Sequence, residues 1–200
     1  MNFLAHAYLS FNKPELLVGN MISDFVKGKS RFNYSQGIQQ GIVLHRQIDA
    51  FTDVHEATKE ARAYLKPAVG LYSGAFVDVV YDHFLANDPG EFSDASLREK
   101  ALETYQVLGV NETFLPPAFK AILPYMQSQN WLYNYKSIAG TKSSFGGVVR
   151  RAAYLENSEF VFNLFEKHYD SLQSCYKAFF PFVKAFSKYQ IEQLDQLNGL

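Results

Sequence analysis

Ionisable side chains recur at intervals of four residues within residues 41–53, a stretch that is otherwise largely apolar. Four residues make about one helical turn, so in a helix His45 and Asp49 share a face. Ile42 and Ile48 point in other directions and anchor that helix in a core. A helix that buries its apolar positions and still carries a histidine and a carboxylate needs partners for both groups.

A second apolar run carries matching groups, with Asp78 and Asp82 one turn apart and His83 directly after them. Two such helices facing each other would enclose a polar pocket in an apolar shell. His6 and Asp24 also lie in apolar segments and extend this set. Carboxylate oxygens and imidazole nitrogens that converge in this way suit a divalent metal ion such as Mn²⁺, Mg²⁺ or Fe²⁺.

A structural role for these side chains is the alternative. In that interpretation, His–Asp and Arg–Asp hydrogen bonds hold a helical core, and Arg46 supplies the positive charge. The metal site is favoured because one ion would satisfy most of the buried carboxylates, each of which is costly when unpaired. Nucleophilic catalysis has little support, since Cys175 lies in an aromatic helix and is expected in the core. Phosphate-binding loops of the Gly-x-x-x-x-Gly-Lys type are absent from the sequence.

The composition predicts one folded domain over residues 1–200. Hydrophobic residues make up 48% of the chain, and its 18 Phe and 13 Tyr imply a core rich in rings. A net charge of −1 provides no global field to attract nucleic acid or an anionic membrane, so neither is an expected partner. The longest apolar runs are far shorter than a membrane span. A lone cysteine and the lack of a signal-peptide pattern lead us to expect a cytoplasmic protein.

Helical periodicity dominates the chain, and no stretch alternates with period two for long. The expected helices cover residues 2–10, 14–28, 35–53, 54–65, 68–87, 96–108, 116–129, 141–154 and 158–197. Kinks are expected at Pro124 and Pro181. Gly37 and Gly41 lie inside a helix, where glycine is unfavourable, and this indicates close approach of another helix. The fold class is therefore all-α, a single helical bundle.

Four blocks of the sequence, in this order and spacing, resemble the acyl carrier protein phosphodiesterase family. They are Met1-Asn-Phe-Leu-Ala-His6, Gly19-Asn-Met-Ile-Ser-Asp24-Phe-Val-Lys-Gly28, Gly41-Ile-x-x-His45-Arg-x-Ile-Asp49-x-x-Thr-Asp53 and Asp78-x-x-Tyr-Asp82-His83-Phe-Leu. The family removes 4′-phosphopantetheine from holo acyl carrier protein with Mn²⁺ and is regarded as related to the helical HD-domain phosphohydrolases. The resemblance implies an HD-domain-like bundle and a hydrolase whose protein substrate is holo acyl carrier protein.

Roles for the polar residues follow from their chemistry and this resemblance together. The predicted metal ligands are Asp24, His45, Asp82 and His83, with His6 and Asp78 as further ligands or as groups that orient a ligand or the attacking water. Asp49 is the expected base, Arg46 is expected to hold a phosphoryl oxygen, and either His83 or water protonates the leaving serine oxygen. The order Asp82-His83 reverses the usual His-Asp pair, so no ligand is mapped from those hydrolases.

Basic residues form a cluster directly after Asp24, at Lys27, Lys29 and Arg31. Acyl carrier proteins are small and acidic, so we expect this cluster to dock the carrier, with Arg150 and Arg151 as a second contact. Ordinary solvated side chains are the alternative. Two other functions stay open: a metal phosphohydrolase for a small nucleotide or phosphate ester, and a non-catalytic helical binding module.

Overall fold

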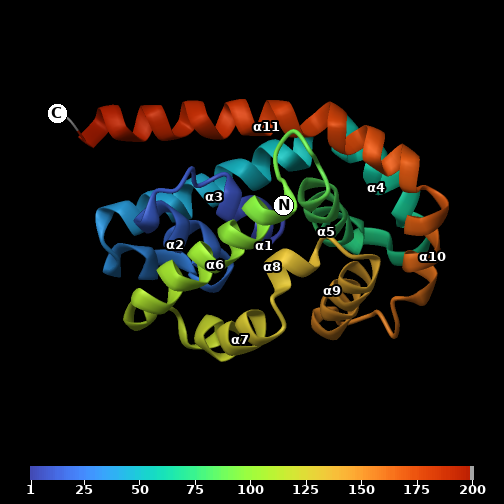
Figure 1. The fold of residues 1–200 in the computed structure, drawn as a ribbon, viewed down its shortest axis with the longest axis horizontal. Helices are drawn as coiled ribbons and strands as arrows, with labels where there is room; N and C mark the ends of the chain where they lie inside the picture. The colour runs from blue at the N-terminus through green and yellow to red at the C-terminus, as the bar shows by residue number, and fades with distance from the viewer. Residues whose placement is uncertain (199–200) are drawn as a thin grey trace.

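The computed structural model describes residues 1–198, which form helices joined by short loops (Figure 1). The α-helices are α1 (Phe3–Tyr8), α2 (Pro14–Ile22), α3 (Gln36–Val54), α4 (Glu56–Val69), α5 (Ser73–Ala86), α6 (Asp94–Val110), α7 (Pro117–Ser128), α8 (Trp131–Asn134), α9 (Ile138–Arg151), α10 (Glu159–Lys167) and α11 (Tyr169–Asn198). No strand forms within the described residues. The prediction of an all-α fold is confirmed.

The long helix α11 runs along one edge of the molecule, where it contacts α3 and α4 (Figure 1). Helix α5 lies in the interior and contacts α1, α4 and α9. The core between these helices is rich in rings, as predicted, and its fully buried aromatic residues include Phe76, Tyr81, Phe145, Phe165, Tyr176 and Phe179. None of the helices over residues 1–198 is long and apolar enough to cross a bilayer.

Helices α2 and α3 pack with their backbones in direct contact. A Cβ atom on Gly41 would clash with the Leu16 carbonyl oxygen and lie 2.8 Å from the Gly19 Cα, and a Cβ on Gly19 would clash with the Ile38 carbonyl oxygen. The expected close approach at Gly41 is therefore confirmed. Only glycine permits this contact. The contact places α2 beside the part of α3 that carries His45 and Asp49.

Several helix boundaries differ from the expected ones. Helix α2 ends at Ile22 and is followed by a 3₁₀ turn over Ser23–Phe25. Helix α4 continues through Pro67 to Val69, because a proline in the last turn removes only one backbone hydrogen bond. The predicted helix over 158–197 is two helices, α10 and α11, which meet at His168. Only the first of these differences affects the predicted metal ligands, because it moves Asp24 from a helix into a turn.

Substituting Gly41→Ala tests the α2–α3 contact. The new Cβ has no space, so we expect the free energy of unfolding to fall by about 1–3 kcal/mol, as is typical of overpacking. Gly109→Ala is the matched control, since Gly109 is exposed on α6 and a Cβ there meets nothing within 4 Å. That change should raise the free energy of unfolding by about 0.5–1 kcal/mol through helix propensity. Urea unfolding that gives equal values for both variants would contradict the packing argument.

Candidate metal centre

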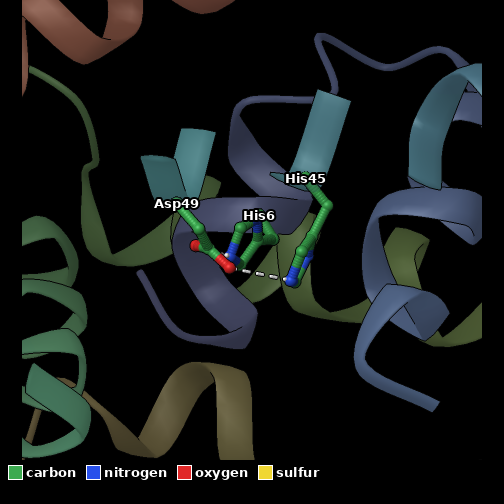
Figure 2. A group of neighbouring side chains, drawn as sticks. All are labelled: His6, His45 and Asp49. Atoms are coloured by element: carbon green, nitrogen blue, oxygen red, sulfur yellow. Dashed lines mark ion pairs between the residues drawn. The ribbon is translucent and has the colours of Figure 1, made fainter. Parts of the chain in front are cut away.

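His6, His45 and Asp49 converge from two helices (Figure 2). Helix α1 contributes His6, and α3 contributes His45 and Asp49 one turn apart. His6 Nε2 lies 3.3 Å from Asp49 Oδ1, and His45 Nε2 lies 3.1 Å from Asp49 Oδ2. The two imidazole rings stack with their centroids 3.9 Å apart. Both histidines are buried whereas the Asp49 side chain is 39% exposed, so the group is accessible from the Asp49 side.

Asp24 joins this group from the 3₁₀ turn that follows α2. Its Oδ1 lies 3.1 Å from His45 Nε2, and its side chain is 75% exposed. Arg46 holds the turn, because its Nη2 donates a hydrogen bond to the Val26 carbonyl oxygen at 3.1 Å. The hydrogen bond with His45 keeps the pKa of Asp24 below its usual value. Asp24 is therefore the most accessible carboxylate of the group.

Asn20, buried on α2, contacts the other nitrogen of both rings. His6 Nδ1 lies 2.7 Å from Asn20 Oδ1, and His45 Nδ1 lies 2.7 Å from the Asn20 backbone carbonyl oxygen. The Asn20 amide nitrogen donates to the His6 carbonyl oxygen and to the Ser10 hydroxyl, so Oδ1 is the acceptor. Each Nδ1 must then carry a proton and donate it to oxygen.

The two Nε2 atoms face only acceptors as a result. His6 Nε2 lies 3.1 Å from the Met1 carbonyl oxygen in addition to its contact with Asp49. A neutral imidazole that is protonated at Nδ1 has only a lone pair at Nε2, which repels a carboxylate oxygen. The arrangement therefore requires either a second proton on a ring or a cation between nitrogen and oxygen. A divalent metal fits these donors, since a ligand imidazole usually donates its other N–H to an oxygen.

Charge within the group favours a proton on His45 when no metal competes for it. Burial disfavours the charged ring, but the hydrogen bonds that His45 donates to Asp24 and Asp49 outweigh burial and raise the pKa of His45 to about 9. Burial and the neighbouring His45 lower the pKa of His6 to about 4. Burial acts to raise the pKa of Asp49, yet hydrogen bonds with the two histidines hold it well below its usual range. A metal ion must displace the His45 proton in order to bind.

Asp78 lies at the edge of the group. Its Oδ1 accepts a hydrogen bond from the Met1 amino group at 2.9 Å, and the same nitrogen lies 3.5 Å from Asp49 Oδ1. Burial raises the pKa of Asp78 despite this cation. Asp78 thus contacts Asp49 indirectly, through the Met1 amino group that lies between the two carboxylates.

Asp82 and His83 do not converge with His45, contrary to expectation. The Asp82 carboxylate accepts hydrogen bonds from the backbone N–H groups that begin α1, at Asn2 (3.2 Å), Leu4 (2.7 Å) and Ala5 (3.3 Å). It caps α1 and so positions His6. His83 follows Asp82 by one residue and points about 100° away around α5, because a helix turns by that angle per residue. Its Nδ1 lies 2.7 Å from the Tyr135 carbonyl oxygen and its Nε2 lies 2.9 Å from the Tyr169 hydroxyl.

Asn20 was not predicted as a site residue. It is fully buried on α2, whose neighbouring positions Val18 and Met21 are apolar. A buried amide must have hydrogen-bond partners, so its place in an apolar run was a usable signal. The identity of those partners depends on the packing of α2 against α1 and α3, which no local pattern reveals.

The basic residues lie in two places. Lys27 and Lys29 are exposed on either side of Gly28, and Arg31 lies over the Phe32 ring at 4.7 Å. Two further arginines, Arg150 and Arg151, end α9 and line a cleft of about 880 Å³. Within residues 1–198 none of these five cations has a carboxylate partner within ion-pair distance. Their charges are therefore free to meet an acidic partner.

Metal binding should be visible as stabilisation. At a Mn²⁺ concentration of 100 times its Kd, the wild-type protein should gain about 2.7 kcal/mol and melt at a higher temperature. His45→Gln should abolish the shift because it removes a central nitrogen. His168→Gln, on the far end of α10, is the control and should keep it. A wild-type Tm unchanged by Mn²⁺, Mg²⁺ and Fe²⁺ would contradict the metal centre.

The proton on His45 predicts that the stability of the metal-free protein, measured in the presence of a chelator, depends on pH. Its folded pKa of about 9 lies above the usual value of 6.5, so the protonated ring contributes stability that is complete below pH 6.5 and is lost as the pH rises through about 9. The loss should be on the order of 3 kcal/mol. Urea unfolding at several pH values measures it, and His45→Gln should flatten the profile. An NMR titration of His45 near pH 6.5 would contradict this charge arrangement.

Comparison with known proteins places the chain in a family. A family model described as acyl carrier protein phosphodiesterase matches residues 1–183. Relatives of that name are 31% identical in Klebsiella pneumoniae (strain 342) and 30% identical in Enterobacter sp. (strain 638), each over 182 residues that cover 90% of this chain and 94% of the relative. No solved structure matches. The chain belongs to the acyl carrier protein phosphodiesterase family, a family of hydrolases.

Proposed function

We propose that this protein hydrolyses the phosphodiester bond between 4′-phosphopantetheine and the serine of holo acyl carrier protein, using a divalent metal with Mn²⁺ as first choice. The products are apo acyl carrier protein and free 4′-phosphopantetheine. The observation that supports this most directly is the group at α1 and α3, in which two Nε2 atoms face the carboxylates of Asp24 and Asp49. Family membership supplies the reaction type and the carrier as substrate. A reducing cytoplasm, where acyl carrier proteins work, is the proposed location.

His6, His45, Asp49 and Asp24 would hold the metal in this proposal. A bound divalent cation lowers the pKa of a water molecule and neutralises phosphoryl oxygens. Asn20 holds both rings with Nδ1 protonated, so that Nε2 stays available. Asp24 and Asp49 are the two solvent-accessible carboxylates of the group, and either can accept the proton of the attacking water.

The remaining roles concern the phosphoryl group and the leaving serine. Water adds to phosphorus and the bond to the serine oxygen breaks, so that oxygen must gain a proton. His83 is engaged by Tyr135 and Tyr169 at both nitrogens, so water is the better-supported donor. Arg46 is exposed and uses Nη2 for Val26, which leaves other N–H groups for a phosphoryl oxygen. Asp82 acts through α1, by fixing the helix that carries His6.

The acidic carrier would dock on the basic residues near Asp24. Lys27 and Lys29 are exposed and unpaired in the described part of the chain, and they follow Asp24 within five positions. Arg150 and Arg151 form the second contact. Association that depends on such exposed charges weakens as salt rises, because screening shortens their range to about 10 Å at 0.1 M.

Incubation of the protein with holo acyl carrier protein and Mn²⁺ should produce the apo carrier, detected by its loss of mass. Asp24→Asn should lower kcat/KM by more than about 100-fold, because it removes a charge from the metal group while keeping its size. Asp53→Asn is the matched control, since Asp53 pairs with Arg62 at the end of α3 and should have little effect.

A charge reversal separates docking from chemistry. Lys27→Glu combined with Lys29→Glu should lower kcat/KM for the carrier much more than for a small phosphodiester. The difference should shrink at high salt. A wild-type protein that cleaves small phosphodiesters and leaves every holo carrier intact would overturn the substrate and favour a phosphohydrolase for small esters.

A further inference from the structure

The cleft of about 880 Å³ begins beside the candidate metal centre. Asn2 and Phe3 line it, and they directly follow Met1, whose carbonyl oxygen lies 3.1 Å from His6 Nε2. The rest of the lining comes from α7, α8, α9 and the short segments that join them. In Figure 1, the short helix α8 lies between the region of α1 and α9. A ligand with one end at the metal centre could therefore extend along this cleft.

A row of aromatic rings connects the two places. Phe25, directly after Asp24, packs against Phe119 with ring centroids 5.3 Å apart. Phe119 contacts Phe3 at 6.4 Å, and Phe3 contacts Trp131 at 6.4 Å. Both Phe3 and Trp131 line the cleft. Phe119 is fully buried, so the row runs through the core from Phe25 and reaches the cleft at Phe3 and Trp131, which make part of its lining apolar.

The wall formed by α9 consists of small and polar residues. Ser143, Gly146 and Gly147 line it, together with the two arginines at its end. A Cβ on Gly147 would lie 3.6 Å from Arg150 Nη2 and 3.7 Å from Arg151 Nη1, so both guanidinium groups lie along this face. They have no carboxylate partner within residues 1–198. Their N–H groups are available to carbonyl or hydroxyl oxygens.

The lining selects a ligand that is long and has two different edges. One edge must be apolar to cover the rings, and the other must carry oxygen acceptors for the arginines and the Ser143 hydroxyl. We infer that the cleft binds the pantetheine arm, a linear chain with geminal methyl groups, a hydroxyl and amide groups, while the phosphodiester lies at the metal centre. This inference rests on the proposed function, because that function supplies the arm.

Trp131 provides a direct test, since it is the chain's one tryptophan and lines the cleft. Pantetheine carries no phosphate, so it probes the cleft without the metal centre. Titrating it into the wild-type protein should change the Trp131 fluorescence saturably and release or absorb heat in calorimetry. Gly147→Leu should weaken this binding by about tenfold or more, because the side chain occupies the part of the cleft beside Arg150 and Arg151. Gly109→Leu makes the same change on exposed α6 and should bind pantetheine as the wild type does.

Kinetics with the holo carrier keep this inference separate from the proposed function. Gly147→Leu should lower the ratio of kcat/KM for the holo carrier to that for a small phosphodiester, while Gly109→Leu preserves the ratio. Gly146→Leu serves as a second variant, and the Mn²⁺-dependent rise in Tm shows that each variant is folded. If the wild type cleaves the holo carrier but both cleft variants keep the wild-type ratio and pantetheine affinity, the cleft inference is wrong. If the wild type leaves the holo carrier intact, the proposed function fails.

Discussion

The candidate site depends on one buried amide. Asn20 accepts a hydrogen bond from each of two histidines, one through its side chain and one through its backbone. Both Nε2 atoms must then point at carboxylates, and acceptors cannot face one another without a proton or a cation between them. The raised pKa of His45 and the lowered pKa of His6 favour one additional proton on His45, with His6 neutral, when no metal is bound. The same constraint prepares the group for a divalent ion.

The packing of α2 on α3 makes this constraint possible. Asn20 reaches His45 only because Gly19 and Gly41 let the two backbones touch. A larger residue at either position would separate the helices and move the Asn20 carbonyl away from the imidazole. Gly19 and Gly41 weaken their helices locally, but they bring the Asn20 carbonyl within hydrogen-bond distance of His45.

Helix α5 contributes support, although its sequence resembles that of a ligand-bearing helix. Asp82 satisfies the free N–H groups at the start of α1, and Asp78 holds the Met1 amino group beside Asp49. Both carboxylates thus position the N-terminal segment that carries His6 and borders the cleft. A short helix such as α1 has little stability of its own, so such external caps matter more for it than for a long helix.

The sequence by itself determined the helical class, the pairing of His45 with Asp49 on one face, the close approach at Gly41 and the family. These features depend on local periodicity, residue size or a linear motif, all of which can be read without a partner segment. Tertiary structure alone decided that Asn20 orients the rings, that Asp82 caps α1 and that His83 faces Tyr135 and Tyr169. Each of those outcomes depends on how a helix is rotated against its neighbours. A rotation of about 100°, the angle between consecutive residues, exchanges a ligand position for a core position without changing the local pattern.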